Sequence, residues 1–410
     1  MEHGISKLDL KRQNRMQVLK ILKQNGPTSR IDIASTLELT RAAITIITNE
    51  MIEQGIIHEI GEYKHTTEKA PRGRKKILID INHNYKFVVG VTIEEDIVSV
   101  GLSTLAGAVL DKRNVELEGD LDFETILDYV KTAVLEILGD NCLDKTNILG
   151  IGLGVFPTMH EKLHIRQVNG ELDYSYLKNR VAEITTLPII IDNSVKGSAM
   201  ANIDFLRDRQ PDRINTAFLQ YGNSLHFVVT NLNDPIKSYD NRTDFVDRII
   251  INPNADEITC DCKRRGCAKS SVTPAAILYN AKKMFSAETT PILYKLCNGE
   301  RDNVNGKLII EAFRKGDEGI IKLREKTIDL LAVLLNNLYF STNPQKIVLH
   351  NFRFIDNDYE TLVERTRAIG GEEVANSICL SIIDEKQRLL SGCALAIRAL
   401  FYTRGGFDFR

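Results

Sequence analysis

Three cysteines lie within eight positions of the chain, in the stretch CDCKRRGCAK at residues 260–269. Cys260, Cys262 and Cys267 carry thiols, which bind zinc as thiolates, and structural zinc sites are tetrahedral with four ligands. The spacing therefore predicts one structural zinc ion held by these residues and a fourth ligand. The alternative is three reduced thiols that bind nothing. Seven cysteines without a secretion signal indicate a reducing cytoplasm, so we expect a cytoplasmic protein.

Basic residues gather near the N-terminus. Residues 1–76 carry 14 Lys and Arg against 9 Asp and Glu, whereas the whole chain has a formal charge of −2. A basic head on an acidic body indicates that the head meets a polyanion such as DNA. Because no apolar run approaches the roughly 18 residues of a membrane helix, we expect no membrane contact.

The head has the pattern of a winged helix-turn-helix. Apolar spacing predicts a helix at 9–24 and a second one that begins at Ser29, which has an S-x-x-D capping pattern. A two-residue turn leads to a third helix, capped by Thr40 and closed by Gly55. Two strands, at 56–60 and 77–81, flank a polar loop with a basic tip. The alternative is a helical bundle that binds nothing.

Small polar side chains and one arginine occupy the outer face of the third helix, which suits entry into the major groove of DNA. The basic loop tip suits phosphates or a narrow minor groove. The predicted DNA contacts are Ser29, Arg30, Thr40, Arg41, Ala42, Thr45, Asn49, Arg72, Arg74 and Lys75.

The body reads as two similar α/β lobes. Three β-rich runs with short connections occupy 87–115, and strands then alternate with helices. A second pair of β-rich runs follows at 216–232, and long helices follow it, notably at 319–342. A strand pattern that occurs twice among helices predicts two α/β lobes.

These stretches resemble the ROK family (repressor, open reading frame, kinase), which contains sugar kinases and related transcription factors. The resemblance is carried by the head through APRGRKKILIDIN, by ILGIGLGVFPT and PIIIDNSVKGSAMA, and by CDCKRRGC and LSGCALAIRALF. It implies an α/β chain with an N-terminal winged helix-turn-helix at 1–82. An actin-like (ribonuclease-H-like) ROK body would follow at 83–410. Lobe one would span about 83–195 plus the C-terminal helix, and lobe two about 196–385.

The kinase motifs of the family are missing here. Where the kinases have a Gly-Gly-Thr turn, this chain has TIEED at 92–96, and three acids would repel a triphosphate. The resemblance places the catalytic base of the kinases at Ser194, whose hydroxyl is not basic at neutral pH. We therefore predict no catalytic residue, no enzymatic activity and no ATP as cofactor.

The resemblance also places a sugar site. Its polar anchors would fall on Asp192, Asn193, Arg248 and Lys269, which we predict as the effector contacts. Arg248 and Lys269 stand where the family has histidine and glutamate. One interpretation is an acidic or phosphorylated sugar effector. The other is a pocket that no longer binds a ligand.

In the family a histidine completes the zinc site, and Arg248 occupies that position here. Asp256, Glu257, Asp261 or a water would then be the fourth ligand. The resemblance further implies a repressor of carbohydrate genes that binds operator DNA as a homodimer or higher oligomer. A regulator whose body senses a protein partner, rather than a sugar, is the alternative.

Overall fold

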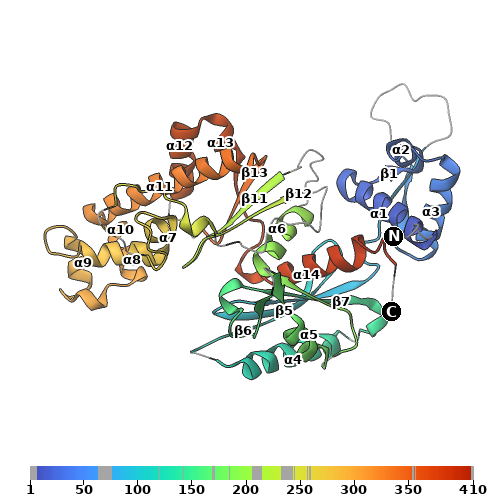
Figure 1. Cartoon of the computed structure of the whole chain (residues 1–410), viewed down its shortest axis with the longest axis horizontal. Helices are drawn as coiled ribbons and strands as arrows, with labels where there is room; N and C mark the ends of the chain where they lie inside the picture. Colours follow the sequence, from blue (N-terminus) through green and yellow to red (C-terminus); the bar gives the residue numbers. More distant parts are fainter. Residues whose placement is uncertain are drawn as a thin grey trace. The chain divides into compact units, whose positions relative to one another are not determined.

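The chain forms two compact units in a computed structural model (Figure 1). The structure describes residues 7–62, 76–119, 121–141, 143–168, 171–183, 185–205, 215–231, 243, 245–255, 257, 260–352, 355 and 357–407. One unit comprises Met1–Asp212 with Glu385–Arg410, and the other comprises Arg213–Asp384. Among the described residues, no helix combines the length and the apolar character that a membrane crossing needs.

The head contains three helices and a small sheet, as the sequence predicts. The helices are α1 (Lys7–Asn25), α2 (Arg30–Thr36) and α3 (Arg41–Glu53). Strands β1 (Thr28–Ser29), β2 (Ile57–Glu62) and β3 (Ile77–Ile81) form a sheet in the order β1-β3-β2. The loop between β2 and β3 is the predicted wing, and its basic tip with Arg72, Arg74 and Lys75 lies outside the described residues.

Local capping explains where the helices of the head begin and end. The hydroxyl of Ser29 accepts a hydrogen bond from the amide of Asp32, and that of Thr40 accepts one from the amide of Ala43. Glu38 and Gly55 both have positive φ, so the chain turns sharply after α2 and after α3. Ile33, Ile44 and Met51 are fully buried and form part of the core between the helices.

Lobe one is built on a five-stranded sheet in the order β10-β7-β4-β5-β6. The strands are β4 (Phe87–Ile93), β5 (Ile97–Ser103), β6 (Val109–Glu116), β7 (Ile148–Val155) and β10 (Ile189–Asn193). Strands β4, β7 and β10 are mutually parallel, so their carboxyl ends meet at one edge of the sheet. Short strands β8 (Arg166–Val168) and β9 (Glu171–Asp173) form a separate hairpin.

Helices cover both faces of this sheet (Figure 1). Helices α4 (Phe123–Asp140) and α5 (Ser175–Ala182) lie on one face and contribute to its main apolar core. Helices α14 (Leu390–Ala396) and α6 (Ser194–Asp204) pack against each other, and α14 lies on the other face. The C-terminal helix is α-helical only over Leu390–Ala396, and a π-helical segment, Ile397–Tyr402, continues it.

The assignment of α6 differs from the boundary predicted between the lobes. The prediction began lobe two at about residue 196, which lies inside α6. The contacts of α6 with α14 and with β7 instead place it in the first unit. Gly197 is one reason, because a side chain there would collide with the backbone of Ser391 in α14.

Lobe two has a four-stranded sheet in the order β12-β11-β13-β14. Strands β11 (Asn215–Gln220) and β12 (His226–Asn231) are antiparallel, whereas β13 (Lys346–His350) and β14 (Ile378–Leu380) are parallel to β11. The long predicted helix is confirmed as α11 (Glu318–Thr342). The other helices are α7 (Ala268–Val272), α8 (Pro274–Lys283), α9 (Pro291–Leu296), α10 (Gly306–Arg314), α12 (Asp358–Gly370) and α13 (Glu372–Ser377).

Gly392 of α14 and Gly152 of β7 allow α14 to lie directly on the sheet of lobe one. A Cβ on Gly392 would lie 2.3 Å from the carbonyl oxygen of Gly152 and 2.5 Å from that of Val91. Backbone atoms of a central strand cannot move aside, so Gly392→Ala should lower the free energy of unfolding by about 3 kcal/mol. Urea unfolding of the full chain measures this change.

Gly139→Ala is the matched control, because nothing lies within 4 Å of a Cβ at Gly139 in α4. Alanine should be neutral or stabilising there by about 0.5 kcal/mol. Equal effects of the two substitutions would contradict the close approach of α14 to the sheet.

Candidate functional site

The exposed face of α3 is the candidate DNA-reading surface. Arg41, Ala42, Thr45, Ile46 and Asn49 are all exposed, at the spacing of one helical face. The opposite face, with Ile44 and Met51, is fully buried in the head. Capping by Thr40 leaves the helix N-terminus at the same end as Arg41, which has no ion-pair partner among the described residues. A positive helix end and a free guanidinium suit the major groove of DNA.

Two of the predicted contacts have a structural role in the head. Ser29 is 2% exposed, and its hydroxyl both caps α2 and donates to the carboxylate of Asp32. Arg30 donates to the side chains of Thr48 and Asn49 and forms an ion pair with Glu59. Its burial leaves Ser29 with little exposed surface in the head, and its prediction as a DNA contact stays a prediction. Arg30 instead holds α2 against α3 and β2.

Ile46 lies on the same exposed face and was not among the predicted DNA contacts. Its side chain is 62% exposed in the middle of the face formed by Arg41, Ala42, Thr45 and Asn49. An exposed branched side chain on a recognition helix suits contact with the methyl group of thymine. The helical spacing alone would have placed it on this face, but an apolar residue there read as a poor grip on the DNA backbone.

A buried ion network attaches the head to lobe one. The ammonium of Lys23 in α1 lies 2.6 Å from a carboxylate oxygen of Asp204, at the end of α6. Arg398, in the π-helical segment, donates to both carboxylate oxygens of Asp204 at 2.6 and 2.8 Å. The side chains of Asp204 and Arg398 are only 2% and 3% exposed. Burial disfavours the charge of Asp204, but the two cations outweigh it and lower the pKa of Asp204.

A second contact joins the same surfaces. Arg15 in α1 is fully buried, and its guanidinium donates to the carbonyl of Gly405 and to the side chain of Gln54. It also lies 3.8 Å from the ring centroid of Phe407, in a cation–π contact. The C-terminal segment thus packs on α1 through two buried cations, Arg15 and Lys23. No local sequence pattern predicted this, because the partners are hundreds of residues apart.

At the carboxyl end of β4, an arginine from the C-terminal part of the first unit contacts the turn that leads to β5. Arg388 donates to Glu94 at 2.8 Å and to Asp96 at 2.9 Å, within the turn predicted to lack phosphate-binding glycines. Ser194 is 1% exposed at the start of α6. A guanidinium held by two acids now occupies the turn between β4 and β5.

The four predicted effector residues belong to different units. Asn193 is 1% exposed and caps α6 by accepting from the amide of Val195, while Asp192 lies 3.5 Å from Lys196. Both belong to the first unit. In the second unit, Arg248 is exposed, and Lys269 lies 3.3 Å from the carboxylate of Asp261. Asp261 therefore balances the positive charge of Lys269, one of the two charges on which the interpretation of an acidic ligand rested.

The three cysteine sulfurs lie within 4.8 Å of one another, so they can act as ligands of one metal ion. The sulfurs of Cys262 and Cys267 are 3.6 Å apart, which is about the separation of two thiolates on one tetrahedral zinc. Lys263 and Gly266 have positive φ, which turns the loop so that the thiols converge. The residues present fit a metal ion of this kind.

The contacts of the carboxylates bear on which of them can be the fourth ligand. Glu257 is bound to Lys283 and Tyr279 and does not join the cysteine cluster. Asp256 lies outside the described residues. Asp261 lies 3.1 Å from the sulfur of Cys260, but it pairs with Lys269 and, like Glu257, is not part of the group of side chains whose ligand atoms all lie within 4.8 Å of one another.

The head and the body together define a class of protein: a winged helix-turn-helix DNA-binding protein with a two-lobed α/β body. Residues 11–58 match the model "Winged helix-turn-helix DNA-binding", and residues 247–373 match the model "ROK family". The chain therefore carries a ROK-family domain behind a DNA-binding head, as the resemblance implied.

Known proteins agree with this architecture. The xylose repressor of Caldicellulosiruptor bescii is 24% identical over 350 residues, which are 83% of this chain and 84% of that protein. The crystal structure of a ROK family transcriptional regulator, a homolog of the E. coli MLC protein, has a TM-score of 0.70 at 20% identity and covers 96% of this chain and 97% of its own. A ROK family glucokinase from Streptomyces griseus has a TM-score of 0.54 at 20% identity, over 76% of this chain and 99% of its own. The fold of the body is thus shared by regulators and kinases.

The buried network makes one substitution decisive. Asp204→Asn removes the carboxylate charge that Lys23 and Arg398 share, so it should lower the free energy of unfolding by about 3 kcal/mol or more. Thermal unfolding of the full chain measures the loss.

Asp128→Asn, at an exposed carboxylate in α4 with a weak ion pair to Lys131, is the control and should change stability by less than about 0.5 kcal/mol. A wild-type melting temperature in the Asp204→Asn variant would show that the network is not formed in solution.

Glu94 predicts a pH dependence. Burial raises its pKa to about 7, although Arg388 lies beside it. The folded chain then holds a proton on Glu94 that the unfolded chain has lost. The stability that Glu94 contributes is therefore fully present below about pH 4.5 and is lost as the pH rises toward 7.

Denaturant unfolding at a series of pH values tests this behaviour. Relative to the wild type, Glu94→Gln should become more stable as the pH rises across that window, because it has no proton to lose. Glu118→Gln, at an exposed carboxylate that does not contribute to the pKa shift of Glu94, should follow the wild type. A constant difference between Glu94→Gln and the wild type from pH 4.5 to 7 would contradict the raised pKa.

Proposed function

We propose that this protein is a DNA-binding transcriptional repressor of carbohydrate-related genes. The observation that carries the proposal is the exposed face of α3, with Arg41 free, on a head that buried ion pairs attach to a ROK body. A DNA-reading helix needs such support, because base contacts discriminate only when the helix is held in register. The relatives named repressors support the sign of regulation.

The body acts in this proposal as a sensor without catalysis. The turn at Glu94 binds the guanidinium of Arg388, and a serine, Ser194, stands at the position of the catalytic base. Neither group can hold a phosphate or take a proton from a sugar hydroxyl at neutral pH. A purified-protein assay with ATP and a panel of sugars should therefore show no phosphorylation above the background without enzyme, and turnover of any sugar would overturn this part.

Zinc, oligomeric state and effector are further parts of the proposal. The cysteine cluster would hold one structural zinc with Asp256, Asp261 or a water as fourth ligand, and a dimer would place two α3 helices on a palindromic operator. The effector would be a carbohydrate, contacted by Asp192, Asn193, Arg248 and Lys269. A ligand that binds one conformation of the body more tightly would change operator affinity by mass action.

Fluorescence anisotropy against DNA enriched from a random pool tests the proposal. The full chain should bind the enriched sequence more tightly than scrambled DNA, with an affinity that falls steeply with salt, and a sugar from a panel should release it. Equal affinity for both sequences would overturn DNA recognition. Selective binding that no sugar changes would instead assign the signal to a protein partner.

Arg41→Ala should weaken binding to the enriched sequence by about 10- to 100-fold, because one specific base contact contributes about 1–3 kcal/mol. Its affinity for scrambled DNA should change little. Arg74→Ala, in the wing, should instead weaken binding to both sequences and reduce the salt dependence. Lys178→Ala, on lobe one, is the control and should leave both affinities unchanged. If Arg41→Ala keeps the wild-type preference for the enriched sequence, α3 is not the helix that reads the DNA.

A further inference from the structure

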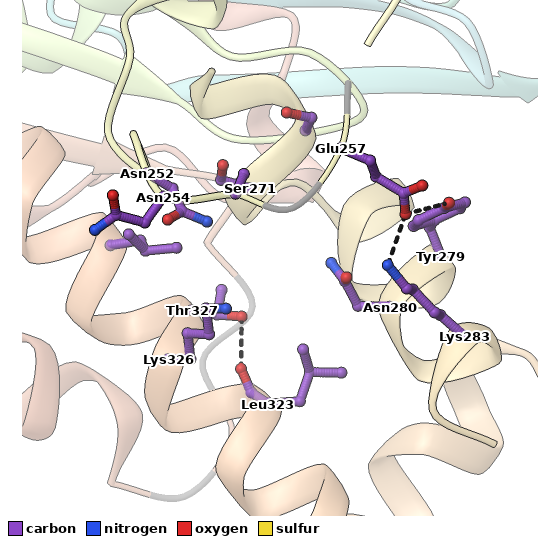
Figure 2. A pocket seen from close by; sticks show the side chains of 13 residues that line it. Asn252, Asn254, Glu257, Ser271, Tyr279, Asn280, Lys283, Leu323, Lys326 and Thr327 are labelled. Carbon is purple, nitrogen blue, oxygen red and sulfur yellow. Dashed lines mark hydrogen bonds and ion pairs between the residues drawn. The ribbon is translucent and has the colours of Figure 1, made fainter. Parts of the chain in front are cut away.

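Lobe two contains a polar cavity behind the cysteine loop, distinct from the residues discussed so far (Figure 2). The cavity has a volume of about 120 Å³ and lies between the loop at 252–257, α7, α8 and α11. A water molecule needs roughly 10–15 Å³ of such space, so the cavity has room for about ten waters or a ligand with about a dozen non-hydrogen atoms. That is the size of a monosaccharide.

The lining is made mainly of amides and hydroxyls. Of the thirteen residues that line it, only Ala255, Leu323 and Leu330 are apolar. The amides come from Asn252, Asn254 and Asn280, on the loop and on α8. Amides and hydroxyls both donate and accept hydrogen bonds, so they match the hydroxyl groups of a polyol. An apolar ligand would leave these polar groups without partners.

The charges of the lining favour a ligand with one negative group. Glu257 accepts from Lys283 at 2.7 Å and from Tyr279 at 3.0 Å, so this acid and this lysine largely neutralise each other. Lys326, on α11, has no ion-pair partner among the described residues and leaves one positive charge in excess. Figure 2 shows Glu257, Tyr279 and Lys283 on one side of the cavity, with Asn252, Asn254 and Lys326 on the other.

The cavity is also joined to the cysteine loop. The hydroxyl of Ser270, one of the lining residues, lies 3.3 Å from the sulfur of Cys267. The backbone N–H of Asn252 donates to the backbone carbonyl of Gly266, the residue before that cysteine. A ligand held by Asn252 and α7 would therefore restrict the same backbone that brings the thiols together.

We propose that this cavity binds a monosaccharide-sized polyhydroxylated ligand that carries one carboxylate or phosphate group. The anionic group lies at Lys326, and the hydroxyls bind the amides of Asn252, Asn254 and Asn280. The site lies entirely within lobe two, so it does not depend on the proposed DNA binding or on the effector residues of the proposed function.

Isothermal titration calorimetry of the full chain at low ionic strength tests the site with three probes: D-gluconate, D-ribose 5-phosphate and D-glucose. Saturable binding of at least one anionic probe is expected, with neutral D-glucose at least about 10-fold weaker because it lacks the charge-assisted hydrogen bond. The two anionic probes separate a carboxylate ligand from a phosphate ligand. No saturable binding of either anion would overturn the site, as would D-glucose binding as tightly as both.

Variants locate the binding within the chain. Lys326→Gln should weaken the anionic probe about 10-fold or more, whereas Lys322→Gln, one turn away on α11 and outside the lining, should leave it unchanged. Asn280→Leu keeps a helix-forming residue of similar size in α8 and should abolish detectable binding. Binding that Asn280→Leu preserves would place the ligand elsewhere and overturn the proposal, whatever the DNA measurements show.

Discussion

The position of the head on lobe one depends on the ion network of Lys23, Asp204 and Arg398. It joins the first helix of the head, the end of α6 and the segment that follows α14. Because the charges are buried, each ion loses its hydration and is stable only while its partners stay in place. The network therefore fixes the head on lobe one more sharply than an apolar contact of the same size would. A change in lobe one that moves α6 or the segment after α14 would therefore also move the head, which carries α3.

At the edge of lobe one where the parallel strands end, several polar side chains make contacts within the chain. Strands β4, β7 and β10 end together, as in a nucleotide-binding sheet. The turn after β4 binds Arg388, and Asn193 and Ser194 serve as the buried start of α6. These side chains thus take part in contacts within the first unit.

The sequence predicted the elements whose signals are local. The caps at Ser29 and Thr40, the apolar stripe of α3 and the convergence of Cys260, Cys262 and Cys267 all depend on residues a few positions apart. It failed where partners are distant or where one residue type has two uses. Ser29 was predicted both as a cap and as a DNA contact, and its burial was not foreseen, while α6 was divided by the predicted lobe boundary. Asp204 gave no signal, since its partners lie about 180 residues before it and about 190 after it.

Pulsed electron–electron double resonance on the full chain tests the central claim, that buried charges hold the head on lobe one. Labels introduced as unnatural amino acids at Glu38 in the head and Asp128 in α4 are exposed and avoid the native thiols. A single narrow distance distribution in the wild type that broadens in Asp204→Asn is the predicted result. A broad distribution in the wild type, or one that Asp204→Asn leaves unchanged, would show that this network does not position the head.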